Sequence, residues 1–392
     1  MIRSIREADV KGRRVLVRVD FNVPLNPATG EVSDDTRIRA CLPTIKYLIE
    51  RDAKVILCSH LGRPKGWDAS LSLSPVAKAL SELLGKEVRL ALNCIGSEAE
   101  RAVSEMREGD ILLLENLRFH KGEEENDPSF AQSLASLADI YVNDAFAVSH
   151  RKHASVEAIT RFLPSYAGFL LEREIEMLGK LLSDPPRPFT ALLGGAKVGD
   201  KIGVLENIIP KVDKALICGG MIATFFRAKG LSVGDSAVEE ERVETCLRIL
   251  KDAEEKGKRL ILPSDLLLAR ALEPGSPTII SKASSIPEGW VIADIGPETI
   301  EEFCRELKGS ATVFWNGPPG VFEIEEFSQG TRKLAQFLSE LDAITIVGGG
   351  STAEVVQSLG LADKFTHIST GGGASLEFLE GKTLPGIKAL ER

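Results

Sequence analysis

The chain repeats one pattern, in which a short apolar run is followed by a polar or glycine-rich turn and then by an amphipathic segment. The apolar runs lack strict alternation, which is typical of parallel strands buried on both faces. Strand and helix alternating along the chain predict right-handed βαβ units and doubly wound parallel sheets, a Rossmann-like α/β fold. Strands are predicted at 14–22, 54–63, 110–119, 139–146, 188–197, 214–220, 259–265, 312–318, 343–350 and 367–373.

Helical spacing is clear in two segments between these runs. Leucines recur at helical intervals over 75–85, where Gly85 ends the pattern. Apolar residues also form one stripe from Leu171 to Leu182, and the prolines of the following DPPRP segment stop that helix. The second helix is either a hinge element or an ordinary packed helix.

A length of 392 residues fits two domains of about 150–200 residues each. We place the boundary at the second helix. The prediction is an N-terminal domain over 1–168 and a second domain over 169–377.

Composition and charge narrow the class of protein. Hydrophobic residues make up 43% and charged residues 27%, which is typical of a folded globular chain. The net charge of -9 argues against a nucleic-acid partner, because such proteins present basic faces to phosphates. The six cysteines are scattered singly, which argues against a disulfide framework or a structural zinc site. No secretory signal or membrane-length apolar run is seen, so we expect a cytoplasmic protein without a membrane partner.

Basic side chains follow the predicted strands of the first half. Ligands of open parallel sheets bind at the carboxyl ends of the strands, and arginine holds phosphate or carboxylate in a bidentate manner. The sequence therefore predicts a pocket for a small ligand that carries a carboxylate and a phosphate. His150 and His153 are three residues apart, but without partnering carboxylates anion binding or packing is favoured over a metal site. The polar residues at these strand ends are Asp20, Asn22, Arg37, His60, Arg63, Arg118, His150, Arg151 and His153.

Glycine-rich turns follow the predicted strands of the second half: GGAKVGDK, CGGM, NGPPG, VGGGST and STGGGAS. Glycine lets backbone amides approach a phosphate, and the N-terminus of a following helix favours negative charge. Lys197 and Lys201 follow the first turn as candidate phosphate ligands. Neither a Walker motif nor a dinucleotide fingerprint is present. The two halves together indicate phosphoryl transfer between a nucleotide and a small anion, with lobe closure to exclude water.

Eight segments together resemble the phosphoglycerate kinase family: VRVDFNVPL, DDTRIRACLPTIKYL, SHLGRPKG, ENLRF, YVNDAFAVSHRKHAS, LLGGAKVGDK, WNGPPGVFE and STGGGASLEFLEGKTLPG. The resemblance runs from Arg18 to Leu390. It implies reversible transfer of a phosphoryl group from ATP to the carboxylate of 3-phosphoglycerate. The products are ADP and 1,3-bisphosphoglycerate, and the reaction belongs to glycolysis or gluconeogenesis. It also implies that a C-terminal tail of about 378–392 packs on the first domain. We expect a monomer.

The resemblance also implies site residues. Arg37 would neutralise charge on the moving phosphoryl group from the substrate side, and Lys197, Gly350 and Gly373 would act near the transfer point. The other implied ligands of the phosphoglycerate are Asp20, Phe21, Asn22, His60, Leu61, Gly62, Arg63, Arg118, Arg151 and His153. The implied nucleotide ligands are Gly195, Lys197, Lys201, Gly219, Asn316, Pro318, Glu323 for the ribose, Gly349, Gly350, Ser351 and Thr352. The nucleophile is already ionised at neutral pH, so no general base is needed.

One residue departs from the family pattern. The family has an aspartate that ligates the nucleotide's Mg²⁺ where this chain has Ser351, and a hydroxyl is a poorer ligand than a carboxylate. Ser351 and Glu354 read as a capping box at a helix start. We therefore expect the metal to rely on phosphate oxygens and water, with Glu354 as a less favoured substitute ligand.

Two other classes of protein remain as alternatives. One is a different nucleotide-using enzyme, either another carboxylate kinase or a dehydrogenase, although the missing dinucleotide fingerprint counts against the dehydrogenase. The other is a non-catalytic binding or scaffold protein on the same fold, for which Ser351 is the one supporting feature.

Overall fold

A computed structural model describes residues 2–391 and divides the chain into two compact units. Unit 1 contains the chain up to Glu176 together with the segment from Thr383, and unit 2 runs from Met177 to Lys382. The chain passes from unit 1 to unit 2 within helix α6 (Phe169–Leu182). The boundary between the two units therefore lies inside this helix, further along the chain than the boundary predicted after residue 168.

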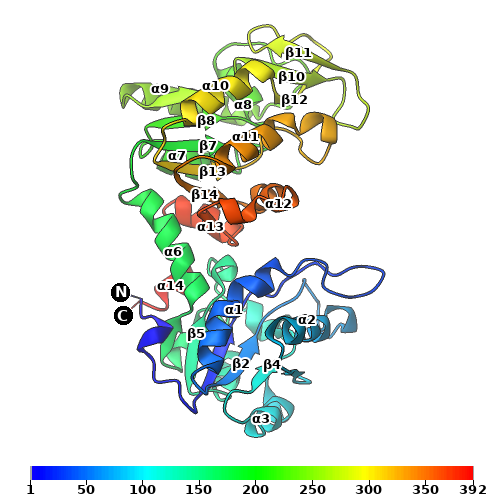
Figure 1. Cartoon of the computed structure of the whole chain (residues 1–392), viewed down its shortest axis with the longest axis vertical. Helices are drawn as coiled ribbons and strands as arrows, with labels where there is room; N and C mark the ends of the chain where they lie inside the picture. The colour runs from blue at the N-terminus through cyan, green and yellow to red at the C-terminus, as the bar shows by residue number, and fades with distance from the viewer. Residues whose placement is uncertain (1, 392) are drawn as a thin grey trace. The chain divides into compact units, whose positions relative to one another are not determined.

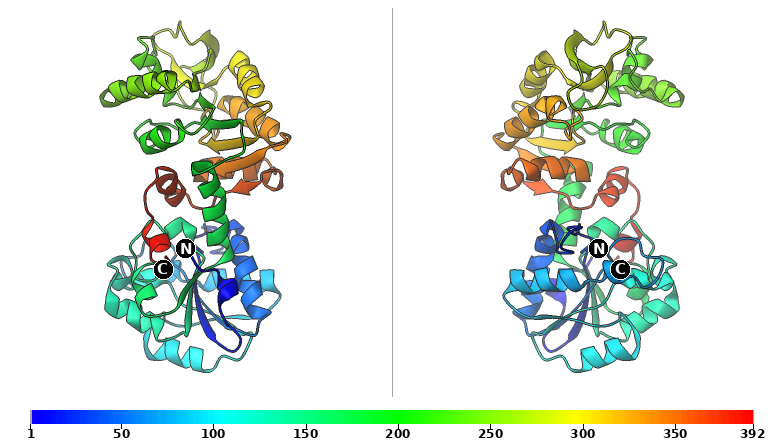
Figure 2. Two further views of the ribbon diagram at one scale, coloured as in Figure 1. Left: turned by 90° about the vertical axis from the view of Figure 1, so that its left-hand side faces the viewer. Right: turned by 90° about the vertical axis from the view of Figure 1, so that its right-hand side faces the viewer.

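Unit 1 is built on a six-stranded sheet with the order β3-β4-β2-β1-β5-β6. Every neighbouring pair in this sheet is parallel. Helices lie on both faces of the sheet, so the unit is doubly wound (Figures 1 and 2). The strands are β1 (Arg14–Arg18), β2 (Lys54–Cys58), β3 (Val88–Leu90), β4 (Ile111–Leu113), β5 (Ile140–Asn143) and β6 (Ser165–Ala167).

The helices of unit 1 follow the start and stop signals of the sequence. The predicted helix over 75–85 is α2 (Ser74–Leu84), with a proline in its first turn and Gly85 in the left-handed conformation at its end. The others are α1 (Thr36–Ile49), α3 (Gly96–Ser104), α4 (Lys121–Glu124), α5 (Pro128–Ala135) and α14 (Pro385–Lys388). Short 3-10 turns lie at Ile5–Glu7, Ala69–Leu71, Leu117–Phe119, Phe146–Val148 and Ala158–Arg161.

The C-terminal segment is part of unit 1. The Gly386 amide donates to the Ser149 carbonyl oxygen at 2.8 Å, and a Cβ at position 386 would lie 2.6 Å from the Val156 side chain. Ile2 and Glu391 pair in an antiparallel bridge, so both ends of the described chain lie together (Figure 1). The segment is therefore held by backbone contacts that a larger residue at 386 would disrupt.

Unit 2 contains a second six-stranded parallel sheet with the order β15-β14-β13-β7-β8-β9. Its strands are β7 (Phe189–Leu193), β8 (Lys214–Ile217), β9 (Arg259–Ile261), β13 (Thr312–Asn316), β14 (Ile344–Gly348) and β15 (His367–Ile368). Its helices are α7 (Ile202–Ile208), α8 (Ile222–Ala228), α9 (Val243–Glu255), α10 (Pro297–Leu307), α11 (Gln329–Ser339), α12 (Gly350–Ser358) and α13 (Gly373–Leu379). Further 3-10 turns lie at Glu240–Arg242, Glu325–Phe327 and Ala362–Lys364.

A three-stranded antiparallel sheet in unit 2 was not predicted. It has the order β11-β10-β12 and consists of β10 (Asp265–Ala269), β11 (Thr278–Lys282) and β12 (Val291–Ile295). β11 is largely exposed and so lacks a buried apolar run that could reveal it. The rest of the prediction, an α/β fold with two doubly wound parallel sheets, is confirmed. Among the helices of residues 2–391, none has the length and apolar character that a membrane crossing requires.

Candidate functional site

The first candidate site lies at the carboxyl ends of the strands of unit 1, and we call it the basic edge. It consists of the predicted residues that follow β1, β2, β4 and β5, together with Arg37 in the first turn of α1. Arg37 Nη1 donates to Asp20 Oδ2 at 2.5 Å. The Asp20 side chain is 7% exposed, whereas the Arg37 side chain is 38% exposed. A buried carboxylate therefore orients a guanidinium that is still open to solvent.

The turn after β2 is clamped from two sides. Asn22 Oδ1 accepts a hydrogen bond from the Gly62 amide at 2.9 Å, and Arg118 Nη1 donates to the Gly62 carbonyl oxygen at 2.8 Å. Gly62 has a φ of +62°, and a Cβ there would lie 2.8 Å from the Leu71 side chain. Phe21 and Leu61 are buried core side chains, so these two positions offer only their backbone to a ligand.

Two histidines of the basic edge are buried beside cationic groups. Burial first, and then the charge of Arg18, lower the pKa of His60 well below its ordinary value. The same two causes, in that order, lower the pKa of His153 to about 4. Both imidazoles are therefore neutral at pH 7, and the positive charge of this edge belongs to its arginines.

The remaining arginines differ in burial. Arg118 is partly buried, and its Nε lies 3.3 Å from Glu124 Oε1. Arg63 and Arg151 are exposed. Arg63 nevertheless lowers the pKa of Arg118, after the larger effect of burial, and Arg151 contributes to the lowered pKa of His153. The structure thus brings the predicted cationic residues within electrostatic reach of one another.

Three buried polar residues beneath this edge were not predicted as site residues: Arg18, Glu123 and Ser155. Arg18 is 1% exposed, and its Nη2 lies 3.2 Å from His60 Nδ1. The sequence signal that could have revealed it is an arginine inside an otherwise apolar strand. No comparable signal marks Glu123, because it is one of three consecutive glutamates in a charged segment.

The second candidate site lies at the carboxyl ends of the parallel strands of unit 2, and we call it the glycine edge. The Gly194 amide donates to the Asn316 carbonyl oxygen at 2.9 Å, which joins the turns after β7 and β13. Gly219 has a φ of +75°, and a Cβ there would lie 2.5 Å from the Gly195 amide nitrogen. Gly317 has a φ of +100°, and a Cβ there would overlap the Gly194 backbone. The turns pack so closely that only glycine fits.

Lysine and asparagine side chains complete the glycine edge. Lys201 Nζ donates to Asn316 Oδ1, and burial lowers the pKa of Lys201 to about 8. Asn316 Nδ2 is a buried donor with no hydrogen-bond partner among the described residues. Lys197 is exposed, and within residues 2–391 it pairs with no carboxylate. The Lys197 ammonium is thus open to a ligand, whereas the unpartnered Asn316 amide lies beneath the surface. Glu239 Oε2 holds the turn between the lysines by accepting from the Val198 and Gly199 amides at 2.6 and 3.1 Å.

The start of α12 corrects one prediction. The N-cap is Gly349, with a φ of +88° and no side-chain capping bond, so the predicted capping box of Ser351 and Glu354 is wrong. Ser351 lies exposed in the first turn instead, because the glycines before it already turn the chain into the helix. Thr352 Oγ1 accepts from the Gly317 amide at 2.7 Å, so this buried hydroxyl ties α12 to the turn after β13.

The other predicted nucleotide residues lie on the same edge or follow it in sequence. Pro318 is partly buried in the turn after β13, and Glu323 is exposed a few residues later. Gly373 is the first residue of α13, after Gly372 with a φ of +51°. Gly350, the first residue of α12, is exposed.

Side chains alone do not supply a metal cage. Across residues 2–391, no group of three or more histidine, cysteine, aspartate or glutamate side chains is arranged to hold an ion. Ser351 is exposed at the position where the sequence resemblance implies a metal-ligating aspartate. Any Mg²⁺ at the glycine edge would therefore need oxygens from its nucleotide and from water.

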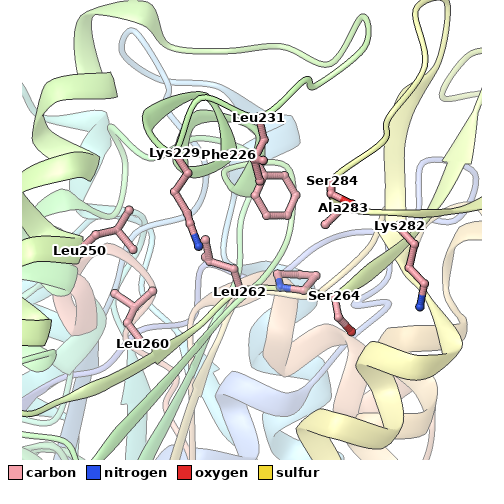
Figure 3. A pocket seen from close by; sticks show the side chains of 11 residues that line it. Phe226, Lys229, Leu231, Leu250, Leu260, Leu262, Ser264, Lys282, Ala283 and Ser284 are labelled. Atoms are coloured by element: carbon pink, nitrogen blue, oxygen red, sulfur yellow. The ribbon is translucent and has the colours of Figure 1, made fainter.

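Two pockets of unit 2 differ in their relation to this edge. A polar pocket of about 570 Å³ borders the first glycine turn and is lined by Gly199, Ile202, Arg242 and Lys382, among others. A pocket of about 300 Å³ has a mixed lining that includes Phe226 of α8, Leu250 of α9 and Leu260 of β9 together with Lys229 and Lys282 (Figure 3). None of the predicted nucleotide residues lines this second pocket, so its side chains serve as controls.

Two doubly wound units, one with a basic edge and one with a glycine edge, define a class of protein: the nucleotide-dependent phosphotransferases. A family model described as phosphoglycerate kinase matches residues 5–382. A phosphoglycerate kinase from Dictyoglomus turgidum is 54% identical over 391 residues, which cover 100% of this chain and 98% of that relative. The chain belongs to the phosphoglycerate kinase family.

Further comparisons agree. A cytosolic phosphoglycerate kinase of Triticum aestivum is 52% identical over 394 residues, covering 100% of this chain and 98% of that relative. The solved phosphoglycerate kinase of Coxiella burnetii has a TM-score of 0.90 and 40% identity, covering 100% of this chain and 99% of the other. The predicted family, enzyme class and function are confirmed: this chain is a transferase of glycolysis with phosphoglycerate kinase activity. The dehydrogenase and scaffold alternatives are wrong.

Proposed function

We propose that the basic edge of unit 1 binds 3-phosphoglycerate and the glycine edge of unit 2 binds ATP or ADP. The observation that carries the proposal is the contrast in donors. The basic edge presents several guanidinium groups, and that of Arg37 is held by the buried Asp20 carboxylate. The glycine edge presents closely packed backbone turns with Lys201 and Asn316. The first set suits a compact dianion, and the second suits a polyphosphate.

The phosphoglycerate would be held by side chains and by one clamped turn. Arg63, Arg118 and Arg151 would supply charge, and His60 and His153 would supply neutral hydrogen-bonding groups. Asp20 and Asn22 orient Arg37 and the Gly62 turn. Phe21, Leu61 and Gly62 would contribute their backbones, since the first two side chains are buried in the core.

The nucleotide phosphates would be held mainly by backbone amides and lysines. Gly195, Gly219, Gly349 and Gly350 lie in turns or at a helix start where an anion can approach the main chain. Lys201 and Asn316 would contact phosphates, Thr352 holds the turn after β13, and Ser351 would face the metal-bound nucleotide. Glu323 would accept from the ribose hydroxyls beside Pro318.

Catalysis would rest on position and charge rather than on proton transfer. Both possible nucleophiles, a carboxylate and an ADP phosphate oxygen, are ionised at neutral pH. Arg37, Lys197 and the amides of Gly350 and Gly373 would neutralise the charge on the moving phosphoryl group. Mg²⁺, bound through nucleotide oxygens and water, would supply further neutralisation.

The remaining predictions concern the whole chain. We propose that residues 1–168 form the phosphoglycerate-binding domain with the tail from about 378, and that residues 169–377 form the nucleotide-binding domain. We also propose a cytoplasmic monomer. The relative from Triticum aestivum is named as a cytosolic enzyme, which supports a cytoplasmic location.

Steady-state kinetics of two variants test the assignment of the edges. Arg118→Ala should raise the KM for 3-phosphoglycerate about tenfold or more with little change in the KM for ATP, because charged hydrogen bonds contribute about 1.5–3 kcal/mol. Lys201→Ala should give the opposite pattern. Lys229→Gln, in the pocket of Figure 3, is the control and should change neither constant. An interchange of the two patterns would refute the assignment.

A further inference from the structure

Four buried residues form a continuous polar chain beneath the basic edge. They are Glu123 and Ser155, both 0% exposed, Arg18 at 1% and His60 at 4%. Burying a cation and a carboxylate is costly unless their hydrogen bonds are satisfied. The contacts between these residues therefore determine how His60 is presented.

The contacts run in one direction. Ser155 Oγ donates to Glu123 Oε1 at 2.6 Å, and the Ser155 amide donates to Glu123 Oε2 at 2.9 Å. Arg18 Nε donates to the same Ser155 Oγ at 2.9 Å. Because a hydroxyl has a single proton, the bond to Glu123 leaves the oxygen lone pairs of Ser155 for Arg18. Glu123 thus fixes the proton of Ser155, and Ser155 holds the guanidinium together with the Val19 carbonyl oxygen, which accepts from Arg18 Nη1.

Arg18 in turn determines the protonation of His60. Its Nη2 lies 3.2 Å from His60 Nδ1, and a guanidinium can only donate. Nδ1 must therefore be the acceptor, which leaves the single imidazole proton on Nε2. Asp20 Oδ1 is 3.9 Å from Nδ1, beyond hydrogen-bond distance. Burial, and after it the nearby groups Arg18, Arg118, His153 and Arg37, lower the pKa of His60 and so disfavour a second proton.

The Nε2 atom of His60 is available to a ligand. It makes no hydrogen bond with any residue of the described chain and is not among its fully buried unpartnered atoms. A fixed Nε2–H group beside several arginines is a directed donor for an anionic oxygen. Unlike an imidazolium, it adds no charge that the buried network must neutralise.

We infer that Glu123 and Ser155 are positioning residues that act through Arg18 to hold His60 as the neutral Nε2–H tautomer, a donor to the anionic substrate. The inference deepens the proposed function and rests on it, since it takes His60 as a ligand of 3-phosphoglycerate. The positioning role can be tested separately from a role in folding, because NMR shows directly which imidazole nitrogen of His60 carries the proton.

The first test is an NMR measurement on the full chain with ¹⁵N-labelled histidine, which is tractable because the chain has five histidines. Two-bond ¹⁵N–¹H correlations distinguish the two tautomers and the imidazolium. His60 should show the Nε2–H pattern from pH 6 to 8, and its signals should shift when 3-phosphoglycerate is added. An Nδ1–H or doubly protonated His60 overturns the inference.

Variants test the positioning role. Ser155→Ala should mix the tautomers of His60 and weaken 3-phosphoglycerate about fivefold, the effect of one lost hydrogen bond, without changing the KM for ATP. Ser155→Thr keeps the hydroxyl and should restore both readouts. Ser133→Ala, an exposed serine of the same unit, is the control. An unchanged tautomer or affinity in Ser155→Ala overturns the role of Ser155.

A pair of substitutions at position 60 tests the identity of the donor. The glutamine amide nitrogen can take the place of Nε2, whereas the asparagine amide nitrogen lies near Nδ1. His60→Gln should therefore bind 3-phosphoglycerate within about threefold of the wild type, and His60→Asn should bind it about tenfold more weakly. Equal losses in both variants overturn the Nε2 assignment.

Failure of the proposed function would look different from failure of this inference. In that case 3-phosphoglycerate would leave the signals of His60 unshifted, and Arg118→Ala would not weaken its binding. The tautomer in the free protein does not depend on either result.

Discussion

The two edges present hydrogen-bond donors from different parts of the chain. The basic edge of unit 1 relies on long side chains, of which Arg37 is oriented by the buried Asp20 carboxylate and Arg118 by the Gly62 carbonyl oxygen. The glycine edge of unit 2 relies on the main chain, and its turns pack so closely that Gly194 and Gly317 leave no room for a Cβ.

This difference predicts how substitutions at each edge affect activity and stability. Side-chain donors can be removed one at a time without disturbing the backbone, so substitutions at the basic edge should change kinetics more than stability. Backbone donors cannot be removed by substitution, but an added methyl group displaces a whole turn. Substitutions at the glycine edge should therefore change stability as well as nucleotide binding.

The largest effect is expected at Arg37. Arg37→Ala should lower kcat about 100- to 1000-fold, because a donor aimed at developing charge contributes about 3–4 kcal/mol in the transition state. The melting temperature should fall as well, because the substitution leaves the buried Asp20 carboxylate without its guanidinium partner. Steady-state rates with both substrates saturating check this. A loss of less than threefold would remove Arg37 from the catalytic group.

The next effect is expected at Gly317. Gly317→Ala should lower the free energy of unfolding by about 3 kcal/mol, because the residue has a φ of +100° and the added Cβ would overlap the Gly194 backbone. Denaturant titration measures the change. Gly350→Ala is the matched control, since a Cβ there meets nothing within 4 Å. Equal stability of the two variants would contradict the close packing of the turns.

A difference in pH dependence should follow from the cations of the two edges. Burial lowers the pKa of Lys201 to about 8, so its charge is present below that pH and is lost as pH rises through it. ADP binding should weaken up to about tenfold between pH 7 and 9.5 in the wild type. The affinity for 3-phosphoglycerate should stay constant, because arginines keep their charge throughout.

Calorimetric titrations at several pH values measure both affinities. In Lys201→Arg, ADP binding should become independent of pH over this range. A wild-type profile that is equally flat would show that Lys201 is not a phosphate ligand.

The smallest effect is expected at Ser351. Ser351→Asp adds a carboxylate in the exposed first turn of α12, and Mg²⁺ prefers carboxylate oxygens. The Mg²⁺ concentration that gives half-maximal activity should fall about three- to tenfold. A rate assay with varied Mg²⁺ at fixed ATP measures it, and Ser358→Asp, at the other end of the helix, is the control. An unchanged Mg²⁺ dependence would contradict the account of the metal.

The sequence predicted the parts of the fold that have a strong local signal. Apolar runs and glycine turns marked both parallel sheets, and the Gly85 stop marked the end of α2. β3 and β6 were missed because Arg89 and Ser165 leave them without an apolar run, and β11 was missed because it is exposed. The buried strands β10 and β12 were missed as well.

The site residues, too, could be predicted only where the sequence carries a local signal. Residues directly after a strand, such as Asp20 and His60, could be placed because parallel strands share an edge. Glu123 contacts Ser155 only through the tertiary fold, 32 positions along the chain, so no local pattern reveals it. The capping box failed because the glycines before Ser351 provide the helix start themselves.

Hydrogen exchange of the full chain, followed by mass spectrometry with each ligand alone, tests the division of labour between the edges most directly. We predict that 3-phosphoglycerate slows exchange in segments 20–22, 60–63, 116–119 and 150–155. ADP with Mg²⁺ should slow exchange in 194–201, 218–221, 316–323 and 349–352. Protection of the glycine turns by 3-phosphoglycerate alone, with the basic edge unprotected, would contradict the account.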